Sequence, residues 1–201
     1  MGGVGKGTTL LVCGTLGGGG ITSLSSPGRV SSNVPPDMCD AFKNDLAPNL
    51  AANYVSKLAY VKERIFAAAM YCSDGRVGDH FDDFMQTGLK LPRYDRLALP
   101  GGPACLAGYT QARLEEEGVI DELQFLVTSH KLSRIVLIQH EGCAFYESRL
   151  KVRPQSSEQL QKADLVRAAY TIRHWVKIEQ IEGYFLKRTD EGMIFEQVRL
   201  D

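Results

Sequence analysis

The sequence lacks an excess of charge, a long apolar run and a regular cysteine spacing, and each absence excludes a class of protein. Its 201 residues carry a formal net charge of -1, and the basic residues are scattered rather than clustered, which disfavours nucleic-acid and anionic-membrane partners. No uncharged apolar run reaches the roughly 18 to 20 residues that a membrane helix needs. The five cysteines form an odd set without a disulfide spacing, which favours free thiols or metal ligands. We therefore expect a soluble protein that has no nucleic-acid or membrane partner.

The composition changes along the chain. Residues 1–44 are rich in glycine, serine and proline and are predicted to form a flexible N-terminal segment, followed by a single α/β domain over residues 45–201. The opening GGVGKGTTL is similar to a phosphate loop, but Gly7 separates Lys6 from Thr8 and breaks that motif. The apolar stretch after Lys6 is a poor secretory signal because four consecutive glycines follow it. We expect a cytoplasmic protein rather than an exported one.

From residue 45 onward, helical and strand-like segments alternate. Apolar residues at spacings of three and four predict helices over residues 50–61, 79–87, 111–130 and 154–175. Short apolar runs predict buried strands over residues 64–71, 94–99 and 134–139, and a turn at 189–192 predicts a C-terminal hairpin. This order predicts the α/β fold class, with a mostly parallel β-sheet, flanking helices and an edge strand or hairpin near the C-terminus.

Two of the predicted strands end in potential metal ligands. Cys72 follows the strand over 64–71, and His140 and Cys143 follow the strand over 134–139. Sites in open α/β sheets gather at the carboxyl ends of the strands, so these side chains could meet in space. Each cysteine alone is typical of a plain buried thiol. Together with the imidazole they supply three of the four ligands of a tetrahedral zinc ion, and we predict Zn²⁺ as the cofactor.

The same residues carry a family resemblance. The pattern C-x-D-x-R at Cys72, Asp74 and Arg76, followed by H-x-x-C at His140 and Cys143, resembles the β-class carbonic anhydrases. The resemblance covers roughly residues 60 to 198 and includes the C-terminal IEGYFLKRTDEGMIFEQV. It implies a zinc enzyme that reversibly hydrates carbon dioxide to bicarbonate through a zinc-bound hydroxide, with a β-carbonic-anhydrase-like fold and homodimers or higher homo-oligomers.

The resemblance also implies roles for the residues beside the ligands. Asp74 and Arg76 are the predicted catalytic pair: Arg76 holds and orients the Asp74 carboxylate, which otherwise could become a fourth zinc ligand in a closed state. Because two thiolates weaken the Lewis acidity of zinc, we expect activity to favour alkaline pH. His80 is a candidate proton shuttle, although it and the neighbouring Asp79, Asp82 and Asp83 are also typical of a solvated first helical turn.

Three alternatives remain open at this point. The same zinc site could hydrolyse another small cumulene, such as carbonyl sulfide or carbon disulfide. The protein could instead be a non-catalytic binding or assembly protein that zinc stabilises, with Asp74 closing the metal. A hydrolase that uses Cys143 as nucleophile and His140 as base is the third alternative.

Overall fold

The computed structural model describes residues 55–201, so the predictions for residues 1–44, and the start of the domain at residue 45, lie outside the described residues. Residues Tyr60–Asp201 form one compact unit, which contains every helix and strand assigned in the described part of the chain. Among the described residues, no helix is long and apolar enough to cross a membrane.

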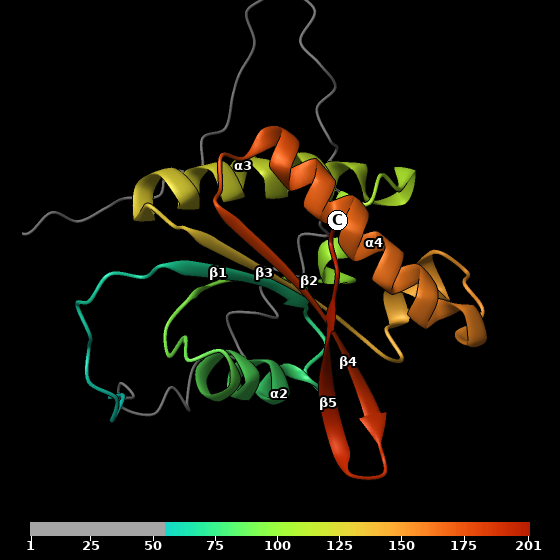
Figure 1. The fold of residues 1–201 in the computed structure, drawn as a ribbon, viewed down its shortest axis with the longest axis horizontal. Helices are drawn as coiled ribbons and strands as arrows, with labels where there is room; N and C mark the ends of the chain where they lie inside the picture. Colours follow the sequence, from blue (N-terminus) through green and yellow to red (C-terminus); the bar gives the residue numbers. More distant parts are fainter. Residues whose placement is uncertain (1–54) are drawn as a thin grey trace, which may run out of the picture. The chain divides into compact units, whose positions relative to one another are not determined.

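A five-stranded sheet forms the centre of this unit (Figure 1). Its order is β2-β1-β3-β4-β5, with the strands β1 (Ala67–Cys72), β2 (Asp95–Leu99), β3 (Arg134–His140), β4 (Gln180–Thr189) and β5 (Gly192–Val198). The first four strands are parallel, and β5 pairs with β4 antiparallel through the predicted turn. The predicted fold class, a mostly parallel α/β sheet with a C-terminal hairpin at its edge, is confirmed.

Helices cover both faces of the sheet. The helix α2 (Gly78–Asp83) lies on one face, and α3 (Arg113–His130) and α4 (Pro154–Trp175) lie together on the other (Figure 1). Successive side chains of a strand point to opposite faces, so β1 contributes Ala68 and Met70 to the core under α3 and α4, and Ala67 and Ala69 to the core over α2. All six residues of β1 are buried, as expected of a central parallel strand.

The predicted helices over 111–130 and 154–175 are confirmed almost to their ends. The helix α4 begins at Pro154, where the fixed φ of proline suits the first helical position. The predicted helix over 79–87 consists of α2 followed by a π-helical turn over Phe84–Gly88.

The predicted helix over 50–61 is wrong in its described part, because residues 55–61 contain no helix. A short helix gains too little to offset its unfavourable nucleation unless its apolar face packs against another element.

Candidate metal centre

The carboxyl ends of β1 and β3 bring the three predicted ligands together. Cys72 is the last residue of β1 and His140 the last residue of β3, and these two strands are parallel neighbours. Cys143 lies in the short loop between β3 and a π-helical turn over Phe145–Arg149. One ligand atom from each of the three side chains lies within 4.8 Å of the others, and all three residues are buried. Within residues 55–201, this is the only such group of His, Cys, Asp or Glu side chains.

The spacing of the two sulfur atoms suits a tetrahedral metal ion. Cys72 Sγ and Cys143 Sγ are 3.8 Å apart. Two thiolates bound to zinc at about 2.3 Å with a tetrahedral angle between them would be separated by about 3.8 Å. Neither sulfur forms a disulfide. The pair is therefore spaced as two ligands of one ion would be.

The hydrogen bonds of His140 leave one ring nitrogen for a metal. Its Nδ1 lies 2.8 Å from the carbonyl oxygen of Glu141, and because a carbonyl can only accept, Nδ1 is the nitrogen that carries the proton. Nε2 is buried and has no hydrogen-bond partner. A histidine that donates through one nitrogen to a backbone carbonyl and leaves the other free has the usual arrangement of a metal ligand.

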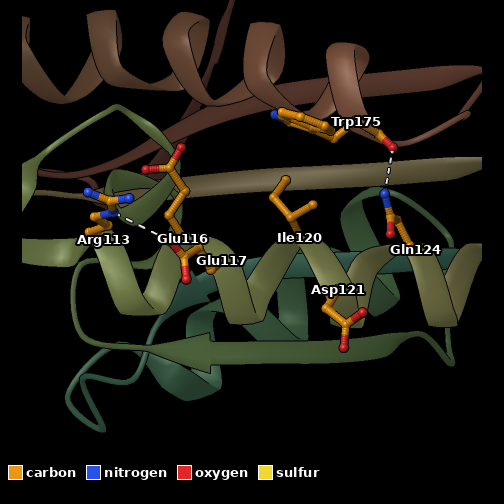
Figure 2. A pocket seen from close by; sticks show the side chains of 7 residues that line it. All are labelled: Arg113, Glu116, Glu117, Ile120, Asp121, Gln124 and Trp175. Carbon is orange, nitrogen blue, oxygen red and sulfur yellow. Dashed lines mark hydrogen bonds and ion pairs between the residues drawn. The ribbon is translucent and has the colours of Figure 1, made fainter. Parts of the chain in front are cut away.

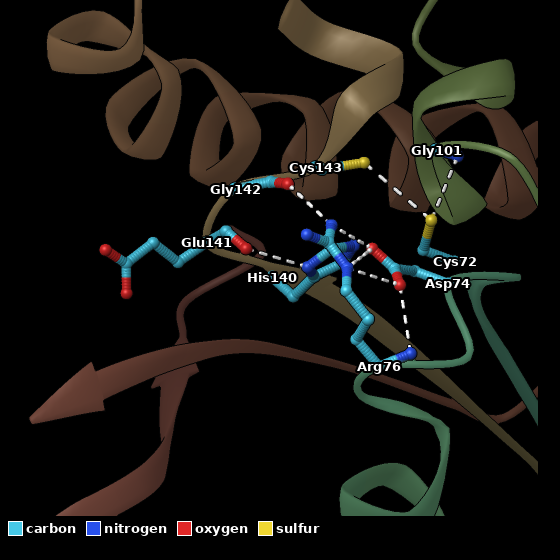
Figure 3. A network of polar contacts seen from close by, with 8 residues as sticks. All are labelled: Cys72, Asp74, Arg76, Gly101, His140, Glu141, Gly142 and Cys143. Atoms are coloured by element: carbon cyan, nitrogen blue, oxygen red, sulfur yellow. Dashed lines mark hydrogen bonds and ion pairs between the residues drawn. The ribbon is translucent and has the colours of Figure 1, made fainter.

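Asp74 and Arg76 form a close ion pair beside this cluster (Figure 3). The guanidinium donates from Nε to both carboxylate oxygens, at 2.9 and 3.1 Å, and from Nη2 to Oδ2. The backbone N–H of Arg76 donates to Oδ1 at 3.0 Å. Arg76 Nη2 also reaches the carbonyl oxygen of Gly142, at 3.4 Å, in the loop between His140 and Cys143. The Asp74 carboxylate is not part of the group of potential ligand atoms, so the structure shows it held by Arg76.

The charges of the site follow from these contacts. The hydrogen bonds from Arg76 lower the pKa of Asp74 to about 2, so its carboxylate is ionised at neutral pH. In the metal-free cluster, a hydrogen bond from the Cys143 thiol lowers the pKa of Cys72, and the same bond together with burial raises the pKa of Cys143. Cys72 is therefore the thiolate of the pair, and Cys143 retains its proton until a cation replaces it.

A cavity of about 160 Å³ lies beside the cluster and is lined by one of its three residues, His140. Its wall also includes both members of the ion pair and the polar residues His80, Glu141 and Arg188. His80, the candidate shuttle, therefore lines the same cavity as His140. Asp82, one of the acidic residues that follow His80, is paired with Arg96 at 2.8 Å.

A larger cavity lies elsewhere, between α3 and the end of α4 (Figure 2). It has a volume of about 540 Å³ and is lined by residues such as Glu116, Ile120 and Trp175. None of the predicted site residues contributes to its wall. Its size alone therefore gives no reason to place the metal site there.

The glycine pair after β2 lies against the metal centre. Gly101 has φ 81° and donates its N–H to Cys72 Sγ at 3.4 Å. A Cβ at Gly101 would lie 2.5 Å from the Phe145 ring, and one at Gly102 would lie 2.7 Å from the backbone of Tyr71. Only glycine therefore lets this loop approach the Cys72 sulfur so closely.

The sequence analysis did not predict two further residues near the cluster, Arg188 and Gln139. Arg188 reaches the cavity from the β4–β5 hairpin, and its backbone N–H is fixed by Glu141 Oε2 at 2.9 Å. Gln139 is fully buried directly before His140. A glutamine at the end of the apolar run RIVLI is a visible signal, because a buried polar side chain needs hydrogen-bond partners.

The fold and site define an α/β protein with a buried Cys-His-Cys cluster that could hold a metal ion. A family model described as "Putative carbonic anhydrase" matches residues 62–198. Because the match covers more than half of the chain, the protein belongs to this family, and the predicted resemblance to carbonic anhydrases is confirmed.

Two solved structures are similar to the chain. One is the β-carbonic anhydrase isoform I of Trichomonas vaginalis, with 13% sequence identity and a TM-score of 0.46, over 80% of this chain and 94% of the other. The second is the β-carbonic anhydrase CafA of Aspergillus fumigatus, with 15% identity and a TM-score of 0.43, over 82% of this chain and 86% of the other. No curated protein sequence matches the chain. The family assignment depends on the family model, because TM-scores below 0.5 do not support it.

Proposed function

We propose that the protein is a zinc-dependent carbonic anhydrase that interconverts carbon dioxide and bicarbonate. The observation that carries this proposal is the convergence of Cys72, His140 and Cys143, whose ligand atoms lie within 4.8 Å of one another in a chain of the carbonic anhydrase family. The orphaned Nε2 of His140 supports it, because a buried ring nitrogen without a partner costs free energy unless a ligand satisfies it.

The donor set favours zinc over other divalent ions. Zinc would be held by the Sγ atoms of Cys72 and Cys143 and by Nε2 of His140, a mixture of soft thiolates and imidazole that magnesium and calcium disfavour. When bound, the ion would supply a Lewis acid that lowers the pKa of a coordinated water toward neutrality. With three protein ligands, one tetrahedral position is left for the reactants.

We propose that Asp74 orients the attacking water. Its carboxylate lies at the cavity wall and can only accept hydrogen bonds while it is ionised, which the low pKa ensures at neutral pH. Arg76 donates hydrogen bonds to both carboxylate oxygens. This pairing supports a site in which Asp74 stays off the metal, and it argues against the alternative of a non-catalytic protein that Asp74 closes.

The cavity suits a small neutral substrate and an anionic product. Its volume of about 160 Å³ is large enough for a few molecules of the size of carbon dioxide but too small for a large substrate. Arg76 and Arg188 line it beside the acidic Asp74 and Glu141, and their guanidinium groups could donate hydrogen bonds to a bicarbonate product. His80 lies in the same wall and could pass a proton between the cavity and solvent, since histidine titrates near neutral pH.

The test is stopped-flow carbon dioxide hydration between pH 6.5 and 9, on protein whose zinc content has been measured. We expect about one zinc per chain, and a rate that rises toward alkaline pH because two thiolate ligands weaken the Lewis acid. Asp74→Ala should retain zinc and lose most of the rate, whereas Cys143→Ser should bind zinc more weakly and lose the rate. Wild-type protein that is fully loaded with zinc and shows no hydration at any pH would refute the proposal. Carbonyl sulfide and carbon disulfide would then be the next substrates to assay.

A further inference from the structure

A fully buried carboxylate lies within α4, away from the predicted site residues. Asp164 has no exposed surface, and it accepts three hydrogen bonds. Tyr109 and Tyr146 each donate their hydroxyl to Oδ2 at 2.8 Å, and Arg167 donates from Nη1 to Oδ1 at 2.7 Å. Burying a carboxylate costs free energy unless such donors surround it. Asp164 therefore fixes the direction in which both tyrosine hydroxyls donate.

The direction of the Tyr146 hydrogen bond also determines how the side-chain amide of Gln139 is oriented. Because the Tyr146 proton points to Asp164, its hydroxyl oxygen is free to accept, and Gln139 Nε2 donates to it at 3.0 Å. The same Nε2 donates to the carbonyl oxygen of Gly101 at 3.2 Å. Both partners need a donor, so the side-chain amide of Gln139 can have only one orientation. Its Oε1 remains buried without a partner.

Gly101 connects the network to the metal centre. Its carbonyl accepts from Gln139, and its N–H donates to Cys72 Sγ at 3.4 Å. The Phe145 ring fills the space beside its Cα, as the 2.5 Å approach to a Cβ at this position shows. Gln139 and the Phe145 ring thus hold the Gly101 loop from two sides. If the Gln139 contact changed, the N–H of Gly101 would shift relative to the Cys72 sulfur.

We propose that Gln139 and Tyr146, anchored by Asp164, are positioning residues that set the N–H···S hydrogen bond to Cys72 and thereby tune how strongly this thiolate donates to the metal. The inference rests on the proposed metal site, since the thiolate acts as a ligand there. A hydrogen bond to a metal-bound thiolate withdraws electron density from the sulfur, and such outer contacts orient and tune metal ligands.

The position of the network favours this role over one in stability alone. Gln139 stands in a strand whose other buried residues are apolar apart from the ligand His140. It leaves Oε1 unsatisfied, which an apolar side chain of similar size would not do. Among the described residues, the network reaches the Cys72 sulfur through the Gly101 amide, while the backbone N–H of Tyr146 donates to the carbonyl oxygen of Cys143 at 3.1 Å.

Two tyrosines provide a matched pair of variants. Tyr146→Phe and Tyr109→Phe each remove one hydroxyl that donates to Asp164 Oδ2 at 2.8 Å, but only Tyr146 also accepts from Gln139. Gln139→Met is the second test, because it keeps the volume and removes the donor to Gly101. The full chain would be loaded with cobalt(II), and the thiolate-to-cobalt charge-transfer band and the cobalt affinity would be measured.

We expect Tyr146→Phe and Gln139→Met to shift the charge-transfer band to longer wavelength, because a thiolate that accepts a weaker hydrogen bond is easier to oxidise. Gln139→Met should also weaken cobalt binding by about tenfold, because the loss of a contact that positions the loop beside Cys72 should outweigh the gain in electron density on the sulfur. Tyr109→Phe should leave the band where it is in the wild type. Equal shifts in both tyrosine variants, or no shift in Tyr146→Phe and Gln139→Met, would overturn the proposal.

A second readout does not depend on a metal or on activity. Hydrogen exchange of the Gly101 amide, followed by NMR in the metal-free protein, should be faster in Tyr146→Phe and Gln139→Met than in Tyr109→Phe. Unchanged exchange in both would overturn the proposal even if the protein bound no cobalt. A protein that hydrated no carbon dioxide but showed both effects would contradict the proposed enzyme while leaving this network in place.

Discussion

At the scale of single residues, the two thiols of the cluster differ although they are chemically identical. Cys72 receives hydrogen bonds from the Cys143 thiol and from the Gly101 amide, and both lower its pKa. Cys143 lies beside that thiolate in a buried position, and both circumstances raise its pKa. In the metal-free protein the two sulfurs therefore carry one proton between them, on Cys143.

This asymmetry predicts the number of protons that zinc displaces. At pH 7 we expect zinc binding to release about one thiol proton, from Cys143, because Cys72 is already ionised. Isothermal titration calorimetry in buffers with different ionisation enthalpies measures this number. Release of two protons would show that both thiols are protonated before the metal arrives.

The ion pair of Asp74 predicts a pH dependence of stability in the metal-free protein. Arg76 lowers the pKa of Asp74 to about 2, below its usual value of about 4 in an unfolded chain. A depressed carboxyl pKa stabilises the fold at pH values above about 4, and this contribution is lost as the pH falls toward 2.

With allowance for the solvent that screens the exposed Arg76, we expect this contribution to be about 1 kcal/mol. Urea unfolding of wild type and Asp74→Asn measures it as a difference in the free energy of unfolding. The difference should be present at pH 7 and smaller at pH 3. A difference that is the same at both pH values would contradict the ion pair as the cause.

At the scale of elements, the site depends on loops that follow the parallel strands. β1 and β3 carry Cys72 and His140 at their last residues, and the Gly101 loop follows β2 on the other side of β1. The loop is held at a positive φ that other residues rarely adopt, with the Phe145 ring packed where a Cβ would be. The geometry at the Cys72 sulfur therefore depends on one glycine.

Gly108 provides a matched control for this loop. It has φ 83°, close to the 81° of Gly101, but no heavy atom lies within 4 Å of its Cβ position. Gly108→Ala should cost about 1 to 2 kcal/mol from its backbone conformation alone. Gly101→Ala should cost about 1 to 3 kcal/mol more, because of the clash with Phe145, and should also weaken zinc binding. Denaturant unfolding and a zinc competition assay measure both effects, and equal costs at the two glycines would contradict the packing argument.

The strands and the long helices could be predicted from sequence because each has a pattern that its packing requires. The runs RIFAAAMY and RIVLIQ became β1 and β3, which are buried on both faces. The predicted helix over 50–61 was wrong in its described part, because periodicity indicates an apolar face but does not show whether another element packs against it. Within the site, the motifs around Cys72 and His140 predicted the three residues that the structure brings together, since the spacing within each motif is short and local.

The rest of the site could not be predicted because it depends on contacts between distant segments. Asp164 is 92 residues from Cys72 in the chain, yet it is linked to the Cys72 sulfur through Tyr146, Gln139 and Gly101. No local pattern marks such a connection. The π-helical turn over Phe145–Arg149, which places Phe145 against Gly101, also leaves no periodicity that a short window could detect.

At the scale of the whole molecule, large apolar side chains remain exposed on the two long helices. Leu114 and Phe125 of α3 are 82% and 59% exposed, and Tyr170 and Trp175 of α4 are 72% and 57% exposed. The predicted homodimer or higher homo-oligomer would bury part of such a surface. We expect light scattering of the full chain to give at least twice the 22.2 kDa of one chain. A mass of 22.2 kDa, that of a monomer, would contradict the predicted homo-oligomer.

The most direct test of the central claim is zinc K-edge X-ray absorption of the purified protein, combined with its metal content. If Cys72, His140 and Cys143 hold the ion, the spectrum will show two sulfur ligands at about 2.3 Å and lighter ligands at about 2.0 Å. Cys143→Ser should then bind zinc weakly or show a single sulfur. A zinc shell of nitrogen and oxygen alone in the wild type, or protein that binds no zinc when it is supplied, would contradict the account.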